Sequence, residues 1–402
     1  MFNLHLSPEQ LEFRDTVRDF VEEEVKPVTL KADRLDLNDR TLPVEVLRKA
    51  SQMGLRTLAL PEDLGGVGAD ALTCCIVTEE LAVGDADVAA VLTETSALGR
   101  RLFSAMTPEQ RERFGSAFLE DDDYHLALAC REPGDDSALG INYHRPAPDI
   151  QLVTTATRDG DHWIINGAKD CVTNGPIAKL IAIEAQTDKG PALILVPRDT
   201  PGLTVSEQPG PRWYHGSCGQ LSLKDVCVPV GNLLGISGAI DSGRAAPLAQ
   251  ALNLGIGRAA YEAALEYAGL RVQGGRRIVE HQAIGTKLAE VAIRLDIVRT
   301  AIWRAAWASD HPDAFADRSL PDLPLTTIAK VFTAETIYRA AKDSAECFGA
   351  MGVMRDMPLQ KYVHDALVCR HSGTSNSDAK LRIAEALAGY RRPANAAALA
   401  AE

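Results

Sequence analysis

Features typical of nucleic-acid-binding or membrane proteins are missing from this sequence. Acidic residues outnumber basic ones, so the 402-residue chain carries a formal net charge of −13, which argues against a nucleic acid as partner. Its apolar runs are far shorter than the roughly 18 to 20 residues of a membrane-spanning helix, and we expect no membrane span. The N-terminus, Met1 to His5, has no basic region and no apolar stretch. We therefore expect no signal peptide and a cytoplasmic protein.

Metal-type cysteine spacing is also absent. The eight cysteines are scattered, and none forms a Cys-x-x-Cys pair of the kind that binds zinc. This pattern predicts reduced thiols and neither a disulfide framework nor a metal site. What is present is ordinary for a globular protein: 46% hydrophobic and 24% charged residues, in a chain long enough for two or three structural units.

Capping signals and apolar periodicity predict helices at both ends of the chain. Ser7-Pro8-Glu9-Gln10 and Thr107-Pro108-Glu109-Gln110 are capping boxes with proline at the first helical position. Helices are predicted over residues 43–54, 71–83, 87–104 and 108–120, and again over 243–271, 279–309, 325–348 and 376–389. The last four, with short connections, are typical of an antiparallel four-helix bundle.

Between the helical blocks the pattern changes to strands. The turn pair Asp159-Gly160 separates two β-rich runs, which indicates a tight hairpin. Further strands are predicted over residues 180–183, 192–196, 203–205 and 221–226, giving a sheet of six to eight strands. We therefore predict an α+β multidomain fold. It comprises an N-terminal helical domain (1–122), a middle β-barrel or sandwich domain (123–236) and a C-terminal four-helix bundle (237–402).

Two segments flanking the hairpin carry a recognisable pattern. They read Glu132-Pro133-Gly134-x-x-Ser137 and Ile165-Asn166-Gly167-x-Lys169-x-x-x-Thr173-Asn174-Gly175. In this order and spacing they resemble the paired middle-domain motifs of the acyl-CoA dehydrogenases. The resemblance extends over nearly the full length, through the Pro61-Glu62-x-x-Gly65-Gly66 loop and the Gly373-Thr374-Ser375 segment. It implies bound FAD and an acyl-thioester substrate.

The resemblance also implies which residues hold the flavin. Thr173 matches the hydroxyl near the flavin N5 edge, and Arg271 matches an arginine that contacts the cofactor across a subunit boundary. Arg131 stands where the family has a hydroxyl, and Cys171 stands where it often has tryptophan. The full cofactor-binding set is Cys130, Arg131, Ser137, Cys171, Thr173, Arg271, Gln282, Gly349, Thr374 and Asn376.

Substrate contacts are expected at Ser137, Asp241 and Arg244, but both usual catalytic glutamates are missing. The two base positions of the family hold Ser372 and Gly243. Neither side chain can deprotonate a carbon acid near neutral pH. Glu94 lies on the helix that resembles the floor of the acyl pocket, and it is the candidate relocated base. Asp87 is expected to begin that helix as an N-cap.

Three functions are compatible with these observations. The first is an FAD-dependent oxidoreductase that dehydrogenates an acyl thioester at its α,β-carbons with a relocated base. The second is a flavoenzyme of the same fold with desulfinase-like or monooxygenase-like chemistry. The third is a base-less subunit of a hetero-oligomeric dehydrogenase. Implied partners are acyl-CoA or an acyl-carrier thioester and an electron acceptor such as an electron-transfer flavoprotein. The implied assembly is a homotetramer or dimer, with a hetero-oligomer as the alternative.

Overall fold

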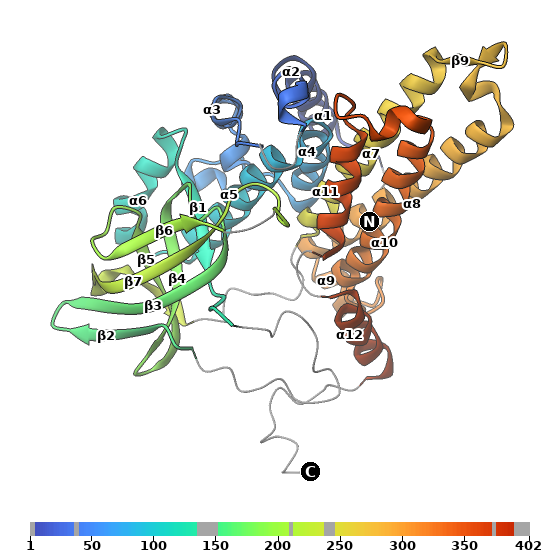
Figure 1. The fold of residues 1–402 in the computed structure, drawn as a ribbon. Coiled ribbons are helices and arrows are strands. Elements are labelled where there is room, and N and C mark those ends of the chain that lie inside the picture. Colours follow the sequence, from blue (N-terminus) through green and yellow to red (C-terminus); the bar gives the residue numbers. More distant parts are fainter. Residues whose placement is uncertain are drawn as a thin grey trace.

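The computed structural model describes residues 5–35, 40–134, 152–208, 212–236, 246–371 and 375–389. Helices of the N-terminal and C-terminal thirds lie side by side, and a single large sheet projects to one side of them (Figure 1). The predicted three-part architecture is therefore confirmed. The exact domain boundaries at 122/123 and 236/237 stay a prediction.

The N-terminal third is helical, and both predicted capping boxes form. Helix α4 is buried on every side, whereas α5 packs against helices on one side and the sheet on the other. The elements are α1 (Pro8–Phe20), the π-helix η1 (Val21–Val25), α2 (Lys26–Thr29), η2 (Ala32–Arg34), α3 (Val44–Gln52), η3 (Leu55–Thr57), η4 (Glu62–Leu64), α4 (Ala71–Gly84), α5 (Ala86–Ala105) and α6 (Pro108–Glu120).

The middle third forms an eight-stranded sheet in the order β6-β7-β3-β2-β4-β5-β8, with β1 paired to β4. The strands are β1 (His125–Ala129), β2 (Thr155–Asp159), β3 (His162–Thr173), β4 (Ala178–Thr187), β5 (Gly190–Pro197), β6 (Leu203–Glu207), β7 (Cys218–Pro229) and β8 (Leu233–Ile236), with the short η6 (Val230–Asn232) before β8. The predicted hairpin joins β2 to β3, and Gly160 has the positive φ (+56°) that its turn requires.

The C-terminal third is a helical bundle whose membership differs from the prediction. Helices α7, α8, α10 and α11 pack together, and α12 packs on α10. The fourth bundle helix is the one at residues 359–371, which the sequence pattern does not predict, and the prediction that the segment at 376–389 fills this place is wrong. The elements are α7 (Leu248–Leu270), the hairpin β9 (Val272–Gln273) and β10 (Arg276–Arg277), η7 (Ile278–Glu280), α8 (Gln282–Asp310), α9 (Asp313–Ala316), α10 (Leu325–Glu346), η8 (Gly349–Val353), α11 (Leu359–His371) and α12 (Asn376–Ala388).

Buried hydrophobic side chains hold the three parts of the molecule together. One continuous core joins the N-terminal helices to the C-terminal bundle, and a second lies within the sheet. A third core joins Leu98, Leu102 and Phe103 of α5 to Leu126 and Leu180 of the sheet. Helix α5 therefore borders every part of the molecule. None of the described helices is both long and apolar enough to cross a bilayer.

Candidate functional site

The Glu-Pro-Gly segment and strand β3 run alongside each other where β1 ends. The Lys169 ammonium donates to the Cys130 carbonyl (3.1 Å) and to Glu132 Oε1 (3.0 Å). The Asp170 amide donates to the Arg131 carbonyl (2.9 Å). These contacts fix Cys130 and Arg131 beside the end of β3, so the two predicted motif segments do meet.

Glu132 and Lys169 form a buried ion pair that holds the Glu-Pro-Gly segment against strand β3. The Lys169 side chain is 0% exposed and that of Glu132 is 6% exposed. Glu132 also accepts from the amides of Val153 (2.6 Å) and Thr154 (2.8 Å). Although burial alone would raise the pKa of Glu132, these hydrogen bonds and the lysine lower it to about 2. Both side chains are thus fully engaged with protein groups.

Strand β3 carries a bulge that redirects Cys171. The register with β7 shifts between Lys169 and Val172, and Cys171 has a φ of +51°. Asp170 Oδ1 holds the bulge by accepting from the Cys171 amide (2.9 Å) and from Gln220 Nε2 (3.0 Å). Thr173, half-buried, pairs with Cys218 at the end of the strand. The predicted residues Cys130, Arg131, Cys171 and Thr173 are therefore brought to one end of the sheet.

Buried polar atoms without a protein partner lie in these same segments. They are Arg131 Nε, Asn174 Oδ1 and Gln208 Oε1. Gln208 follows β6, and its backbone amide donates to the Cys218 carbonyl (2.9 Å). A buried donor or acceptor without a partner costs free energy, so such atoms favour a polar ligand. The isoalloxazine ring of FAD carries both donors and acceptors along one edge, and the residues present fit it.

Asn174, which the sequence prediction did not single out, ties this end of the sheet to α5. Its side-chain amide donates to the Val91 carbonyl (3.2 Å) and to Thr95 Oγ1 (3.2 Å). Its backbone amide donates to the Ser217 carbonyl (2.7 Å). The Asn-Gly pair at 174–175 is a turn signal, and Asn174 has the positive φ (+60°) that asparagine tolerates. This signal could have identified the position.

The expectation that Asp87 caps α5 is wrong. Asp85 is the N-cap, and its Oδ1 accepts from the amides of Asp87 and Val88. Asp87 lies in the first turn and reaches across to the loop before β7. There it accepts from the Gly216 amide (2.8 Å) and pairs with Arg212 (3.2 Å). Asp87 thus joins α5 to the sheet domain.

The loop before β7 also contacts α11. His215 Nε2 lies 3.1 Å from the Asp365 carbonyl oxygen and 3.3 Å from Cys369 Sγ. The Asp365 carboxylate is 1% exposed and pairs with Lys361 (2.9 Å) and Arg40 (2.8 Å). Together these contacts place the last turn of α11, just before Ser372, against the sheet domain.

Glu94 lies on the same face of α5 as Asp87, seven residues and about two helical turns further on. Its side chain is half-buried, and burial raises the pKa of its carboxyl while the positive charge of Arg101 opposes that rise. Within the described residues its carboxylate makes no hydrogen bond or ion pair. A carboxylate with a raised pKa and no protein partner is a stronger base than an ordinary exposed glutamate.

A second group of predicted residues lines a cavity of about 380 Å³ at the far end of the bundle. Arg271, which caps α7, and Gly349, with a φ of +57°, both line it beside the β9–β10 hairpin. Gln282 is exposed at the start of α8, next to the lining residue His281. Figure 1 places this hairpin at the opposite extremity from the sheet, so a single chain does not bring the two groups together.

The remaining predicted residues are placed elsewhere or lie outside the described residues. Asn376 begins α12, where its Oδ1 accepts from Lys330 (3.2 Å). The positions outside the described residues are Ser137, Asp241, Gly243, Arg244, Ser372 and Thr374.

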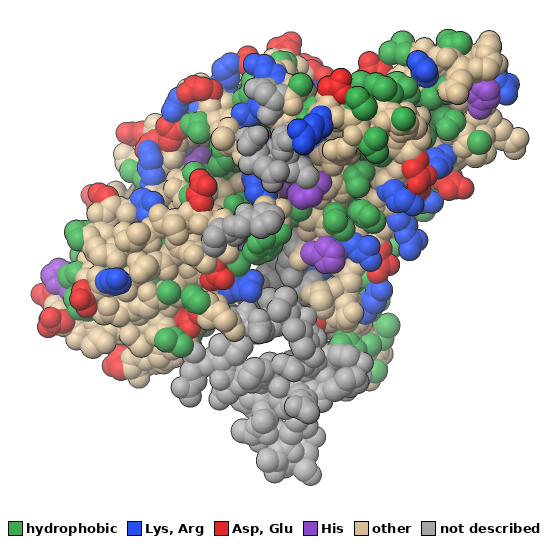
Figure 2. All heavy atoms as spheres, viewed as in Figure 1, with side chains coloured by type: hydrophobic (Ala, Val, Ile, Leu, Met, Phe, Trp, Pro, Cys, Tyr) green, Lys and Arg blue, Asp and Glu red, His purple; other side chains and the backbone are tan. Residues whose placement is uncertain are grey.

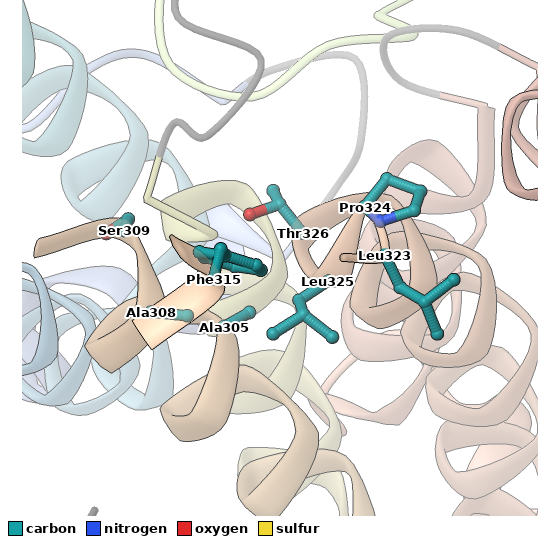
Figure 3. Close-up of a pocket in the computed structure, with 8 residues that line it drawn as sticks. All are labelled: Ala305, Ala308, Ser309, Phe315, Leu323, Pro324, Leu325 and Thr326. Atoms are coloured by element: carbon teal, nitrogen blue, oxygen red, sulfur yellow. The ribbon is translucent and has the colours of Figure 1, made fainter. Parts of the chain in front are cut away.

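Another pocket, under the connection between α8 and α10, is lined by no side chain that could act as an acid, a base or a metal ligand. Its eight lining residues are mostly apolar, and the only polar side chains are the hydroxyls of Ser309 and Thr326 (Figure 3). It belongs to a small satellite core that includes Phe315 and Leu325. Across the described parts of the chain no cluster of three or more His, Cys, Asp or Glu side chains is arranged to hold a metal ion.

Known proteins match this chain over nearly its whole length. Family models match in chain order: the acyl-CoA dehydrogenase N-terminal domain at residues 7–121, the middle domain at 147–226 and the C-terminal domain at 236–388. An acyl-CoA dehydrogenase of Bacillus subtilis is 30% identical over 400 residues, covering 96% of this chain and 100% of its own. The mitochondrial short-chain specific acyl-CoA dehydrogenase of Bos taurus is 29% identical over 394 residues, covering 94% and 90%.

Solved structures give the same result. A glutaryl-coenzyme A dehydrogenase in complex with glutaryl-CoA has a TM-score of 0.82 at 25% identity, with coverage of 97% of this chain and 98% of its own. The butyryl-CoA dehydrogenase of Megasphaera elsdenii shares the fold, with a TM-score of 0.80 at 24% identity and coverage of 96% and 100%. The order of the domains, the paired motif segments and these matches together establish that this chain belongs to the acyl-CoA dehydrogenase family.

Proposed function

We propose that this flavin oxidoreductase, which acts on CH–CH groups, dehydrogenates an acyl thioester with Glu94 as the base. The observation that carries the proposal is the state of the Glu94 carboxyl: half-buried, raised in pKa and without a partner among the described residues. A general base works best when its pKa lies near the operating pH, and a raised carboxyl pKa brings Glu94 toward that range.

FAD is the cofactor of this family, and bound FAD supplies the hydride acceptor. In this proposal Thr173, Cys171, Arg131 and Cys130 border the flavin ring. Arg271, Gly349 and Gln282 would hold the remainder of a cofactor that belongs to a neighbouring copy of the chain. The distance between the two groups within one chain supports a homotetramer or dimer. The roles proposed for Ser137, Asp241, Arg244, Thr374 and Asn376 rest on the sequence motifs alone.

The proposed substrate is an acyl-CoA or an acyl-carrier thioester, and the proposed electron acceptor is an electron-transfer flavoprotein. Relatives named for short-chain acyl-CoA and isobutyryl-CoA support a coenzyme A thioester. The proposed cytoplasmic location rests on the scattered cysteine pattern of the sequence alone.

The test is the rate at which acyl-CoAs bleach the oxidised flavin in stopped-flow experiments. With a panel of linear, branched and ring acyl-CoAs, Glu94→Gln should slow bleaching by about 10²- to 10⁴-fold and leave substrate affinity little changed. Glu112→Gln, which alters an exposed glutamate on α6, is the matched control and should behave as the wild type. An unchanged rate in Glu94→Gln, with a substrate that reduces the wild type, removes Glu94 from the mechanism.

The absence of both usual bases favours a second candidate. With Ser372 and Gly243 at those positions, the scaffold would serve a desulfinase-like or monooxygenase-like reaction in which no α-proton leaves, or a base-less subunit of a hetero-oligomer. Bound FAD that no acyl-CoA of the panel bleaches supports the first of these. A colourless protein that takes up no FAD supports the second.

A further inference from the structure

Arg131 is a charged side chain at the end of the sheet that forms no ion pair with any described group. It follows β1 directly, and its carbonyl is held by the Asp170 amide at 2.9 Å. Its side chain is half-buried, and Nε is buried without a hydrogen-bond partner. Within the described residues its guanidinium takes part in no ion pair.

The positive charge of Arg131 acts on the groups that border the proposed flavin ring. Burial raises the pKa of the Cys171 thiol, and the charge of Arg131 opposes that rise. Burial raises the pKa of the Cys218 thiol to about 12, Cys171 and Asp170 add to that rise, and the charge of Arg131 opposes it. Because electrostatic effects fall with distance, both observations locate the guanidinium close to the bulge of β3.

The neighbouring charged groups, in the Glu-Pro-Gly segment and on β3, form no ion pair with Arg131 among the described contacts. Lys169 is paired with Glu132, and both are buried. The Asp170 carboxylate keeps its negative charge and accepts hydrogen bonds from Gln220 and from the Cys171 amide, but it forms no ion pair with Arg131 among the described contacts. Among the described residues, the Arg131 guanidinium therefore carries a positive charge without an ion-pair partner, and its Nε donor is unused.

We propose that Arg131 sets the reduction potential of the bound flavin by stabilising its reduced form. This inference rests on the proposed FAD site. Uptake of two electrons and one proton converts the neutral flavin ring into an anion. A fixed cation beside the ring therefore favours the reduced form over the oxidised one. Arg131 stands where the related motifs carry a neutral hydroxyl, so this chain would hold FAD at a higher potential than such a site.

The experiment compares how tightly the protein binds oxidised and reduced FAD. Arg131→Gln removes the charge, Arg131→Lys keeps it, and Arg158→Gln removes an equal charge from the exposed face of β2. Dissociation constants are measured for both forms of FAD by titrating the apoprotein anaerobically. The midpoint potential of the loaded protein is measured against a reference dye.

We expect Arg131→Gln to weaken reduced FAD relative to oxidised FAD by about tenfold to hundredfold, which lowers the two-electron potential by about 30–60 mV. Arg131→Lys should recover most of this shift, and Arg158→Gln should match the wild type. An equal potential in wild type and Arg131→Gln, with FAD bound, overturns the inference alone. A wild type that binds no FAD overturns it together with the proposed function. Loss of both FAD forms from both Arg131 variants, at unchanged melting temperature, makes Arg131 a binding residue and also overturns it.

Discussion

At the scale of single residues, the motif amino acids divide into those that build the site and those left open to a ligand. Glu132 and Lys169 are fully occupied by each other and by backbone groups. Among the described residues, neither Arg131 Nε nor the Glu94 carboxylate has a hydrogen-bond partner. The sequence motif alone does not tell which of its residues stabilise the fold and which can contact a ligand. That distinction needs the contacts in the structure, because only they separate a buried paired charge from an unpaired one.

The Glu132–Lys169 pair predicts a specific acid sensitivity. The folded-state pKa of Glu132 is lowered from 4.5 to about 2. Its stabilising contribution is therefore fully present above about pH 4.5 and is lost as the pH falls toward 2, a difference of about 3 kcal/mol. Glu132→Gln should lower the urea midpoint at pH 7, because it leaves the buried Lys169 ammonium unpaired, and should flatten the loss of stability between pH 4.5 and 2.

Urea unfolding followed by circular dichroism at a series of pH values measures this effect. Glu207→Gln, at an exposed glutamate on the edge strand β6, is the control and should retain the wild-type profile. If Glu132→Gln and the wild type lose stability in parallel below pH 4.5, the pair does not contribute as described.

At the scale of elements, α11 is the helix that sequence reasoning missed. Its inward face carries Lys361 and Asp365, which are 2% and 1% exposed, where periodicity analysis expects apolar residues. The two side chains are neutralised by one another and by Asp85 and Arg40, and those partners are more than 270 residues away in the sequence. No local pattern could have revealed that pairing. The capping boxes, the β2–β3 hairpin and α6 were correct because their signals are local.

We expect Lys361→Met to destabilise the protein by about 3–5 kcal/mol, because it removes a buried cation from between two carboxylates, Asp85 and Asp365. The matched control is Lys342→Met, which breaks an exposed pair with the same four-residue spacing, Lys342–Glu346 on α10. That change should cost less than about 1 kcal/mol. Shifts in melting temperature measured by differential scanning fluorimetry compare the two; equal shifts would contradict the assigned role of Lys361.

At the scale of the whole molecule, a second charge network binds the N-terminal helices to the C-terminal bundle. Glu79 and Glu80 of α4 are buried, and they pair with Arg18 of α1, Arg258 of α7 and Arg299 of α8.

Acidic and basic side chains are interspersed over the face of the molecule in Figure 2. Apolar side chains gather where Figure 1 places the β9 hairpin and nearby helix ends. The exposed apolar residues of this region include Leu270, Val272, Val353 and Met354.

Exposed apolar side chains on α8 lead to a prediction about assembly. Ile293 and Ile297 are 58% and 50% exposed and lie one turn apart on a helix of the bundle. If this face joins copies of the chain, Ile293→Glu with Ile297→Glu should yield a species near the 43.2 kDa chain mass in sedimentation velocity. It should also weaken FAD binding at least about tenfold, because the proposed FAD site is shared between copies and buried interface positions carry most of the energy that holds them together.

Leu11→Glu, at an exposed leucine of α1, is the control for this experiment and should leave both mass and FAD content unchanged. A wild type that already sediments at the mass of one chain while holding stoichiometric FAD would contradict the proposed shared cofactor site.

The loop that precedes β7 has a consequence for exchanging parts between relatives. Gly216 has a φ of +72°, which strains any other residue there, and an added Cβ would make a tight contact of 3.1 Å with Val91 Cγ2. Its own amide donates to Asp87 of α5, and the neighbouring His215 ring contacts the Asp365 carbonyl of α11. A chimera that grafts only the middle domain onto another family member would therefore separate this loop from its partners. A functional graft needs Asp87 and the matching α11 from the same parent.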